Sequence, residues 1–136
     1  MAVGFGVLGL NGLAAAWGGI AWMRGDPSVG FWYVLRAAQV AVAAQAVLGG
    51  VLLAQGEDVD GLHLFYGLTP LFVAMVSEGL RVNAAAFELE DVDDVESLER
   101  RDQVLLARRV VMREMGIMTI GTLMIVTLSL RAAGIF

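Results

Sequence analysis

The stretch GLHLFYGLTPLFVAMVSEGL, residues 61–80, decides the fold of this chain. An α-helix needs about 20 mainly apolar residues to cross a hydrocarbon core of roughly 30 Å, and this stretch has that length. It also contains the only histidine of the chain, His63, together with Tyr66, Pro70 and Glu78. The architecture therefore depends on whether these groups face lipid or other helices.

On a helix, at about 100° per residue, the stretch has two different sides. One side collects the small and polar residues: His63, Tyr66, Gly67, Pro70, Ala74, Ser77, Glu78 and Arg81. The opposite side collects the bulky apolar ones: Phe65, Leu68, Phe72, Met75 and Val76. Small residues let helix backbones approach each other, and polar groups in hydrocarbon need partners. We therefore expect the polar side to face other helices and the bulky side to face lipid.

Three further apolar segments flank this stretch. The chain of 136 residues is 58% hydrophobic and 17% charged, against the roughly 45–50% apolar residues of soluble domains. Its mean hydropathy is +0.73. The sequence predicts an all-α integral membrane protein, a four-helix antiparallel bundle that forms a single domain. The predicted spans are residues 3–23, 32–54, 61–80 and 110–130.

The arginines predict the orientation of these spans. All nine basic residues are arginine, and with so much alanine, glycine and valine this indicates a GC-rich bacterial genome. Eight of the nine flank the first loop or lie in or close beside the connection 82–109, and only Arg131 lies on the other side. Positive charge gathers on the cytoplasmic side of membrane proteins. We expect a multi-pass protein of the bacterial inner membrane with both termini outside.

The connection 82–109 is predicted to lie in the cytoplasm. It begins with the acidic run FELEDVDDVE, residues 87–96, which is typical of a solvated segment. From about Asp94 the composition favours a helix, and Asp93 or Asp94 is a suitable N-cap. The fourth helix is therefore expected to begin in the cytoplasm and to continue unbroken into the membrane as a cytoplasmic extension.

Four residues are predicted to form a buried polar and ionic cluster near the inner boundary: Arg36, Gln39, Glu78 and Arg81. Ionisable residues within a span are functional hypotheses by default, and they pair with each other when they are structural. Glu78 and Arg81 are three residues apart and can pair on one helix face. Arg36 can either join them or extend to the interface. A structural ion pair is the favoured interpretation.

His63 supports an alternative function, because it is the one imidazole of the chain. QAVLGGVLLAQGEDVDGLHLFYGLTPLF, residues 45–72, resembles a helix pair of heme A synthase and related b-type cytochrome four-helix bundles. The matching positions are Gln45, Leu48, Gly49 and His63. The resemblance implies that His63 is an axial ligand of haem b, with Gln45 and Tyr66 in the same site. The sequence is also similar to small actinobacterial four-span membrane proteins whose functions are not established.

The chain departs from that pattern because it has no second histidine for the haem. A thioether from Met112, Met115, Met118 or Met124, a five-coordinate iron or a second subunit would have to complete the site. The structural alternative for His63 is a hydrogen bond to a neighbouring helix or to water. Without cysteine, thiolate metal sites and cysteine nucleophiles are excluded, and we predict neither a metal site nor a bound cofactor.

Other motifs point to packing. GFGVLG, residues 4–9, matches the G-x-G-x-x-G pattern but follows no strand, so we interpret it as a helix-packing surface. Gly116 and Gly121 in the last span are expected to serve close helix contacts. There is no catalytic signature and no basic, aromatic-rich patch for nucleic acid.

The leading functional hypothesis is a small non-catalytic membrane protein that acts through packing or partner binding. Its partners would be the lipid bilayer and either further copies of the chain or another membrane protein. A haem- or quinone-associated redox protein that uses His63 is the first alternative. A subunit of an oligomeric transporter or channel is the second, although the sequence shows no internal repeat or broken helices.

Overall fold

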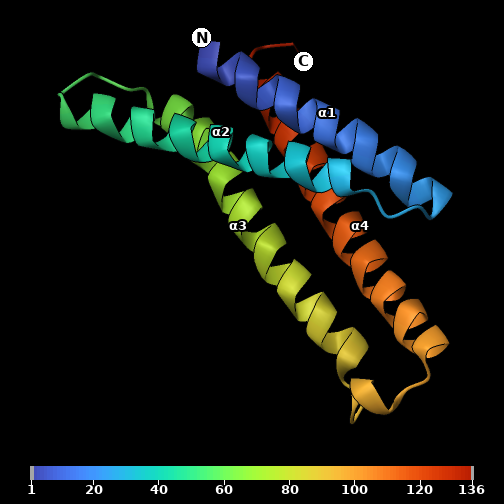
Figure 1. Ribbon diagram of the computed structural model, residues 1–136. Helices are drawn as coiled ribbons and strands as arrows, with labels where there is room; N and C mark the ends of the chain where they lie inside the picture. The colour runs from blue at the N-terminus through green and yellow to red at the C-terminus, as the bar shows by residue number, and fades with distance from the viewer. Residues whose placement is uncertain (1, 136) are drawn as a thin grey trace.

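The computed structural model describes residues 2–135 and is all-α, without strands in that range (Figure 1). Successive long helices reverse direction, so that α1 begins at the same end of the molecule at which α4 finishes (Figure 1). The elements are α1 (Ala2–Arg24), α2 (Val29–Ala54), α3 (Gly61–Leu89), the short 3₁₀ helix η1 (Val95–Ser97) and α4 (Arg100–Ala132).

Three of these helices, α1, α2 and α4, are long and apolar enough to cross a membrane. They contain the predicted spans 3–23, 32–54 and 110–130. The helix α3 is also long enough, but His63, Pro70 and Glu78 lower its hydropathy, and it is not among the three. A membrane crossing by α3 therefore stays a prediction.

Capping residues and glycines set the helix ends. The Ser28 hydroxyl accepts a hydrogen bond from the Phe31 N–H, a typical N-cap of α2. Gly25 after α1 and Gly56 after α2 have φ of 68° and 83°, the left-handed backbone that ends helices and that other residues adopt at a cost. The chain can therefore turn within a few residues after each of these helices.

The connection between α3 and α4 differs from the prediction. The helix α3 continues to Leu89, nine residues beyond the expected span, because alanine and other helix-forming residues follow Asn83. Asp94 caps only the short helix η1 and not α4, because its side chain accepts a hydrogen bond from the Glu96 N–H. The expected continuous helix from Asp94 is therefore wrong, since α4 begins at Arg100. From there it is unbroken to Ala132, as predicted.

The core consists of two apolar clusters between the helices. The first joins α1, α2 and α4 through Ala21, Phe31, Leu35, Met115 and Met118. The second consists of Val7, Val42 and Ile125, with partly buried residues of α3 packed against it. In Figure 1, α1 and α2 lie beside each other and α4 passes behind them, while α3 diverges from α2 towards the tip that it shares with α4. The outward side of α3 is exposed at Phe65, Leu68, Phe72, Met75 and Val76, the five bulky residues expected to face lipid.

Glycines allow the closest helix contacts. A Cβ at Gly18 would lie 2.5 Å from the Phe31 ring, and one at Gly116 would lie 2.8 Å from the Trp22 ring. Gly121 lies directly against the Ser77 side chain. The packing role predicted for Gly116 and Gly121 is therefore confirmed. For the glycines of residues 4–9 that prediction is wrong within this chain, because a Cβ at any of them would meet nothing within 4 Å.

Gly18→Ala is expected to destabilise the protein by about 1–3 kcal/mol, the usual cost of an extra methyl group in a packed core. The reason is that Phe31 is fully buried and cannot move away from the new methyl group. Gly9→Ala on the same helix is the matched control and should cost nothing. Equilibrium unfolding of the detergent-solubilised protein measures both, and equal stability of the two variants would contradict this packing.

Candidate functional site

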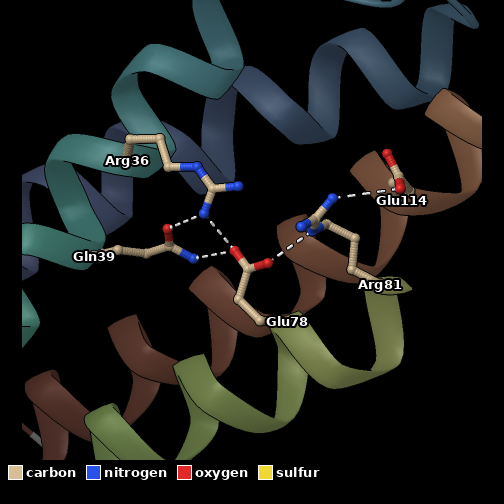
Figure 2. Close-up of polar contacts among 5 residues, drawn as sticks. All are labelled: Arg36, Gln39, Glu78, Arg81 and Glu114. Carbon is tan, nitrogen blue, oxygen red and sulfur yellow. Dashed lines mark hydrogen bonds and ion pairs between the residues drawn. The ribbon is translucent and has the colours of Figure 1, made fainter. Parts of the chain in front are cut away.

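Three helices bring their polar faces together where α2, α3 and α4 meet. Arg36 and Gln39 are three residues apart on α2, and Glu78 and Arg81 are three apart on α3, so each pair shares one helix face. The structure brings all four residues into one network, shown in Figure 2. We call this group, with Glu114 of α4 described below, the ionic cluster.

The Glu78 carboxylate is the centre of the ionic cluster. Its Oε1 accepts hydrogen bonds from Arg36 Nη1 at 2.6 Å and from Gln39 Nε2 at 2.7 Å. Its Oε2 accepts from Arg81 Nε at 2.7 Å. Arg36 Nη1 also donates to Gln39 Oε1 at 2.6 Å. Both carboxylate oxygens are therefore occupied, and Gln39 bridges the two charges as donor and acceptor.

Sequence reasoning missed Glu114. Arg81 extends from Glu78 to this residue of α4, with 3.4 Å between Arg81 Nη1 and Glu114 Oε1 (Figure 2). The signal was present, because Glu114 is the only acidic residue within 110–130. Two arginines then face two glutamates, so the ionic cluster is neutral. Burial rises from Arg36, whose side chain is 52% exposed, to Glu114 at 15%.

The arginines also pack on neighbouring groups. The Arg81 guanidinium lies 6.0 Å from the centre of the Trp32 ring, within the range of a cation–π contact. Outside the ionic cluster, Glu88 near the end of α3 pairs with Arg113 and, at 3.7 Å, with Arg109. Arg108 Nη2 donates to the Gly25 carbonyl at 2.6 Å. These contacts fasten α4 to α3 and to the turn that follows α1.

The ionic cluster is suited to holding helices in register. Each of its charged groups has an opposite charge within hydrogen-bonding distance or at 3.4 Å. Breaking a buried ion pair on one side leaves an uncompensated charge, which strongly destabilises a protein. None of the four charged groups stands apart as a free base or acid. The arrangement therefore supports the structural interpretation of Arg36, Gln39, Glu78 and Arg81.

His63 does not face another helix, so the prediction that it points inward is wrong. It is exposed, and it has no hydrogen bond or ion pair within residues 2–135. The helical wheel placed it on the same side as the buried residues of α3, Pro70 and Ser77. Those residues lie about two turns or more further along the helix, whereas a Cβ added at Gly61 or Gly67, in the first turns of α3, would meet nothing within 4 Å.

Gln45 and Tyr66 are not assembled with His63. Gln45 is partly buried on α2, and its Oε1 is a buried oxygen without a hydrogen-bond partner. Tyr66 is partly buried and makes an edge contact with Phe65, with 5.6 Å between ring centres. No hydrogen bond joins any two of the three residues in the described chain.

Three of the four candidate methionine ligands lie away from His63, and the fourth, Met124, is exposed. Met115 and Met118 are buried in the first apolar cluster, and Met112 packs against it. Met118 is one helical turn from Gly121, which touches Ser77. Ser77 is 14 residues from His63, a distance of about 21 Å along α3 at 1.5 Å per residue. The structure therefore does not bring His63 and these methionines into one haem site.

Comparison with models of protein families, with curated proteins and with solved structures finds no match to this chain. Among the described residues, no group of three or more histidine, aspartate or glutamate side chains is placed to hold a metal ion. The site must therefore be interpreted from its own geometry.

Glu78→Gln is expected to reduce the free energy of unfolding by about 2 kcal/mol, because it removes the charged acceptor of three hydrogen bonds. Arg36→Gln should cost less than about 1 kcal/mol, since that side chain is half-exposed and its ion pair is screened. Unfolding in detergent measures both. A larger loss from Arg36→Gln than from Glu78→Gln would show that Glu78 is not the centre of the ionic cluster.

The exposure of His63 generates a second prediction. Purified from cells supplied with haem, the protein should show no Soret band, and His63→Ala should change neither its absorption spectrum nor its stability by more than a few tenths of a kcal/mol. Absorption spectroscopy and unfolding check this. A Soret band that His63→Ala abolishes while the helical content is retained would establish the haem alternative.

Proposed function

We propose that this chain is a four-span protein of the bacterial inner membrane, without catalysis of its own, that binds another membrane protein through the outer halves of α2 and α3. Both termini lie outside, and the tip formed by residues 90–99 lies in the cytoplasm. The observation that carries the proposal is a pair of polar groups on those outer halves that have no partner within residues 2–135, Gln45 Oε1 and the His63 imidazole.

The two-sided character of α3 supports its crossing of the membrane. Its bulky apolar side is exposed from Phe65 to Val76, while Pro70 and Ser77 are buried. A helix with one lipid-compatible side and one polar side is stable in a bilayer when the polar side meets other helices. The ionic cluster supplies those partners for Glu78 and Arg81.

Arginine placement supports the orientation. Arg108 of α4 contacts the turn after α1, and Arg113 pairs with Glu88 of α3, so the arginine-bearing ends of three helices lie together. At the other end the α2–α3 loop carries only acidic charge, at Glu57, Asp58 and Asp60. Cytoplasmic placement of the arginines then puts that loop outside.

The outer halves of α2 and α3 have the features of a helix-docking surface. Gly49 and Gly50 have nothing near an added Cβ, and Leu48 is half-exposed beside them. Small residues permit close approach, and polar groups at such a surface strengthen association in hydrocarbon. The Gln45 oxygen is buried without a partner in residues 2–135, and it gains a hydrogen-bond donor when the amide turns towards the docked helix. The acidic loop favours a partner with basic residues at its outer end.

Because the chain has no cysteine, a single photoreactive or thiol-reactive probe can be placed at will. A photo-crosslinker at Leu48 should give a discrete protein adduct in native membranes, whereas the same probe at Met75 should give only lipid adducts. Both positions are exposed and apolar, so Met75 is a matched control. Mass spectrometry identifies the adducts.

The role of Gln45 makes the test specific. Gln45→Leu removes the acceptor and should reduce the Leu48 adduct several-fold, without changing expression. Identical adducts at Leu48 and Met75, or an adduct that is indifferent to Gln45→Leu, would contradict partner binding at this surface. An adduct with twice the mass of the chain would show that the partner is a second copy of this chain and not a different membrane protein.

A further inference from the structure

A layer of polar side chains separates the two apolar clusters of the core. It consists of the buried residues Asn11 of α1, Ser77 of α3, and Thr119 and Thr122 of α4. Asn11 is 1% exposed and Ser77 is 6% exposed. Buried polar groups cost free energy unless they are hydrogen-bonded, and a protein interior in a membrane offers few partners. The partners of this layer therefore need to be accounted for one by one.

Two members of the layer satisfy part of their hydrogen-bonding capacity on their own helices. Asn11 Nδ2 donates to the Val7 carbonyl at 2.9 Å. Thr122 Oγ1 donates to the Thr119 carbonyl at 2.8 Å. The Ser77 hydroxyl, by contrast, has no hydrogen-bond partner in residues 2–135, and neither does the Asn11 Oδ1 atom. These groups need a donor and an acceptor that the described chain does not provide.

A small cavity lies where these groups meet. The volume within which the centre of a water molecule can lie is about 10 Å³, and this is about enough for one water molecule. All four long helices line it, with polar side chains from Asn11, Gln39, Ser77 and Thr122. A cavity of this size holds water when two to four polar partners surround it, and stays dry when its walls are apolar.

We propose that this cavity binds one water molecule, held by Asn11, Ser77 and Thr122. The water donates to Asn11 Oδ1 and to Thr122 Oγ1, whose own hydrogen is already used, and it accepts from the Ser77 hydroxyl. This arrangement satisfies Asn11 Oδ1 and the Ser77 hydroxyl, whereas the buried Thr119 Oγ1 does not line the cavity and keeps no hydrogen-bond partner among the described residues. It also joins α1, α3 and α4 at one point of the core.

Gln39 connects the bound water to the ionic cluster. Its side chain lines the cavity, and its Nε2 donates to Glu78 Oε1. Nε2 carries a second hydrogen, for which residues 2–135 show no acceptor, and in the proposed site the water accepts it. The polar layer and the ionic cluster therefore form one continuous set of polar contacts, from Asn11 in the core to Arg36 at the surface. The bound water joins α1, α3 and α4, and the ionic cluster joins α2, α3 and α4.

Selective labelling makes the water directly observable. The chain has two asparagines, Asn11 and Asn83, so protein labelled with ¹⁵N-asparagine shows only two side-chain amide pairs. In detergent micelles, the Asn11 amide should show water cross-peaks of opposite sign in NOE and rotating-frame experiments, the signature of a long-lived water. Asn83 is exposed and should show only the weak effects of fast-exchanging water. Asn83→Gln assigns the signals.

Two conservative substitutions test the site. Ser77→Ala and Thr122→Val remove one hydroxyl each and change the side-chain volume little, so the combined variant should lose the Asn11–water cross-peaks while the backbone spectrum stays that of the wild type. Absence of the cross-peaks in the wild-type protein would overturn the proposal whether or not the variant folds. Their persistence in a folded double variant would overturn the assignment of the water to these hydroxyls.

Discussion

The Glu78 carboxylate is the constraint on which the arrangement of α2, α3 and α4 depends. A charged group near hydrocarbon is stable only with partners, and Glu78 takes three: two arginines and a glutamine, from its own helix and from α2. Arg81 then requires Glu114, which draws in α4. Because these distances are short, α2, α3 and α4 can slide past each other only by breaking the network.

The close packing of the core follows from that register. With Arg81 beside Glu114, Ser77 one turn earlier on α3 falls against Gly121 on α4, where no larger residue would fit. The same level of the core contains the polar layer and its cavity. Apolar clusters fill the space on either side of it. An apolar contact surface alone tolerates sliding, whereas polar groups at fixed depths do not.

Most helix starts and ends could be predicted from the sequence. Whether a single side chain such as His63 meets a neighbouring helix could not. The bounds of α1 and α2 lie within three residues of the predicted spans, because uncharged apolar runs end where charged or turn-forming residues begin. Arg36, Gln39, Glu78 and Arg81 could be placed together because their spacing put them on facing sides at one depth. His63 shared that helix side, but periodicity gives direction and not the presence of a neighbour.

The extension of α3 shows a different limit of sequence reasoning. An acidic run after Phe87 favoured a solvated segment, yet the helix continues to Leu89, where Glu88 finds Arg109 and Arg113. Pairing between α3 and α4 stabilises turns that local composition alone left undecided. Glu114 was missed for the same reason, since its partner lies 33 residues away in the chain.

We propose that α3 crosses the membrane and places the Glu78 network at its cytoplasmic boundary. The most direct measurement is the reaction of single-cysteine variants with a membrane-impermeant maleimide, at Asp58→Cys before α3 and at Ser97→Cys after it. Both positions are exposed, and the chain has no other cysteine. We expect Asp58→Cys to react in intact cells with a permeable outer membrane and Ser97→Cys to react only after the inner membrane is opened. Reaction of both from the same side would contradict the claim.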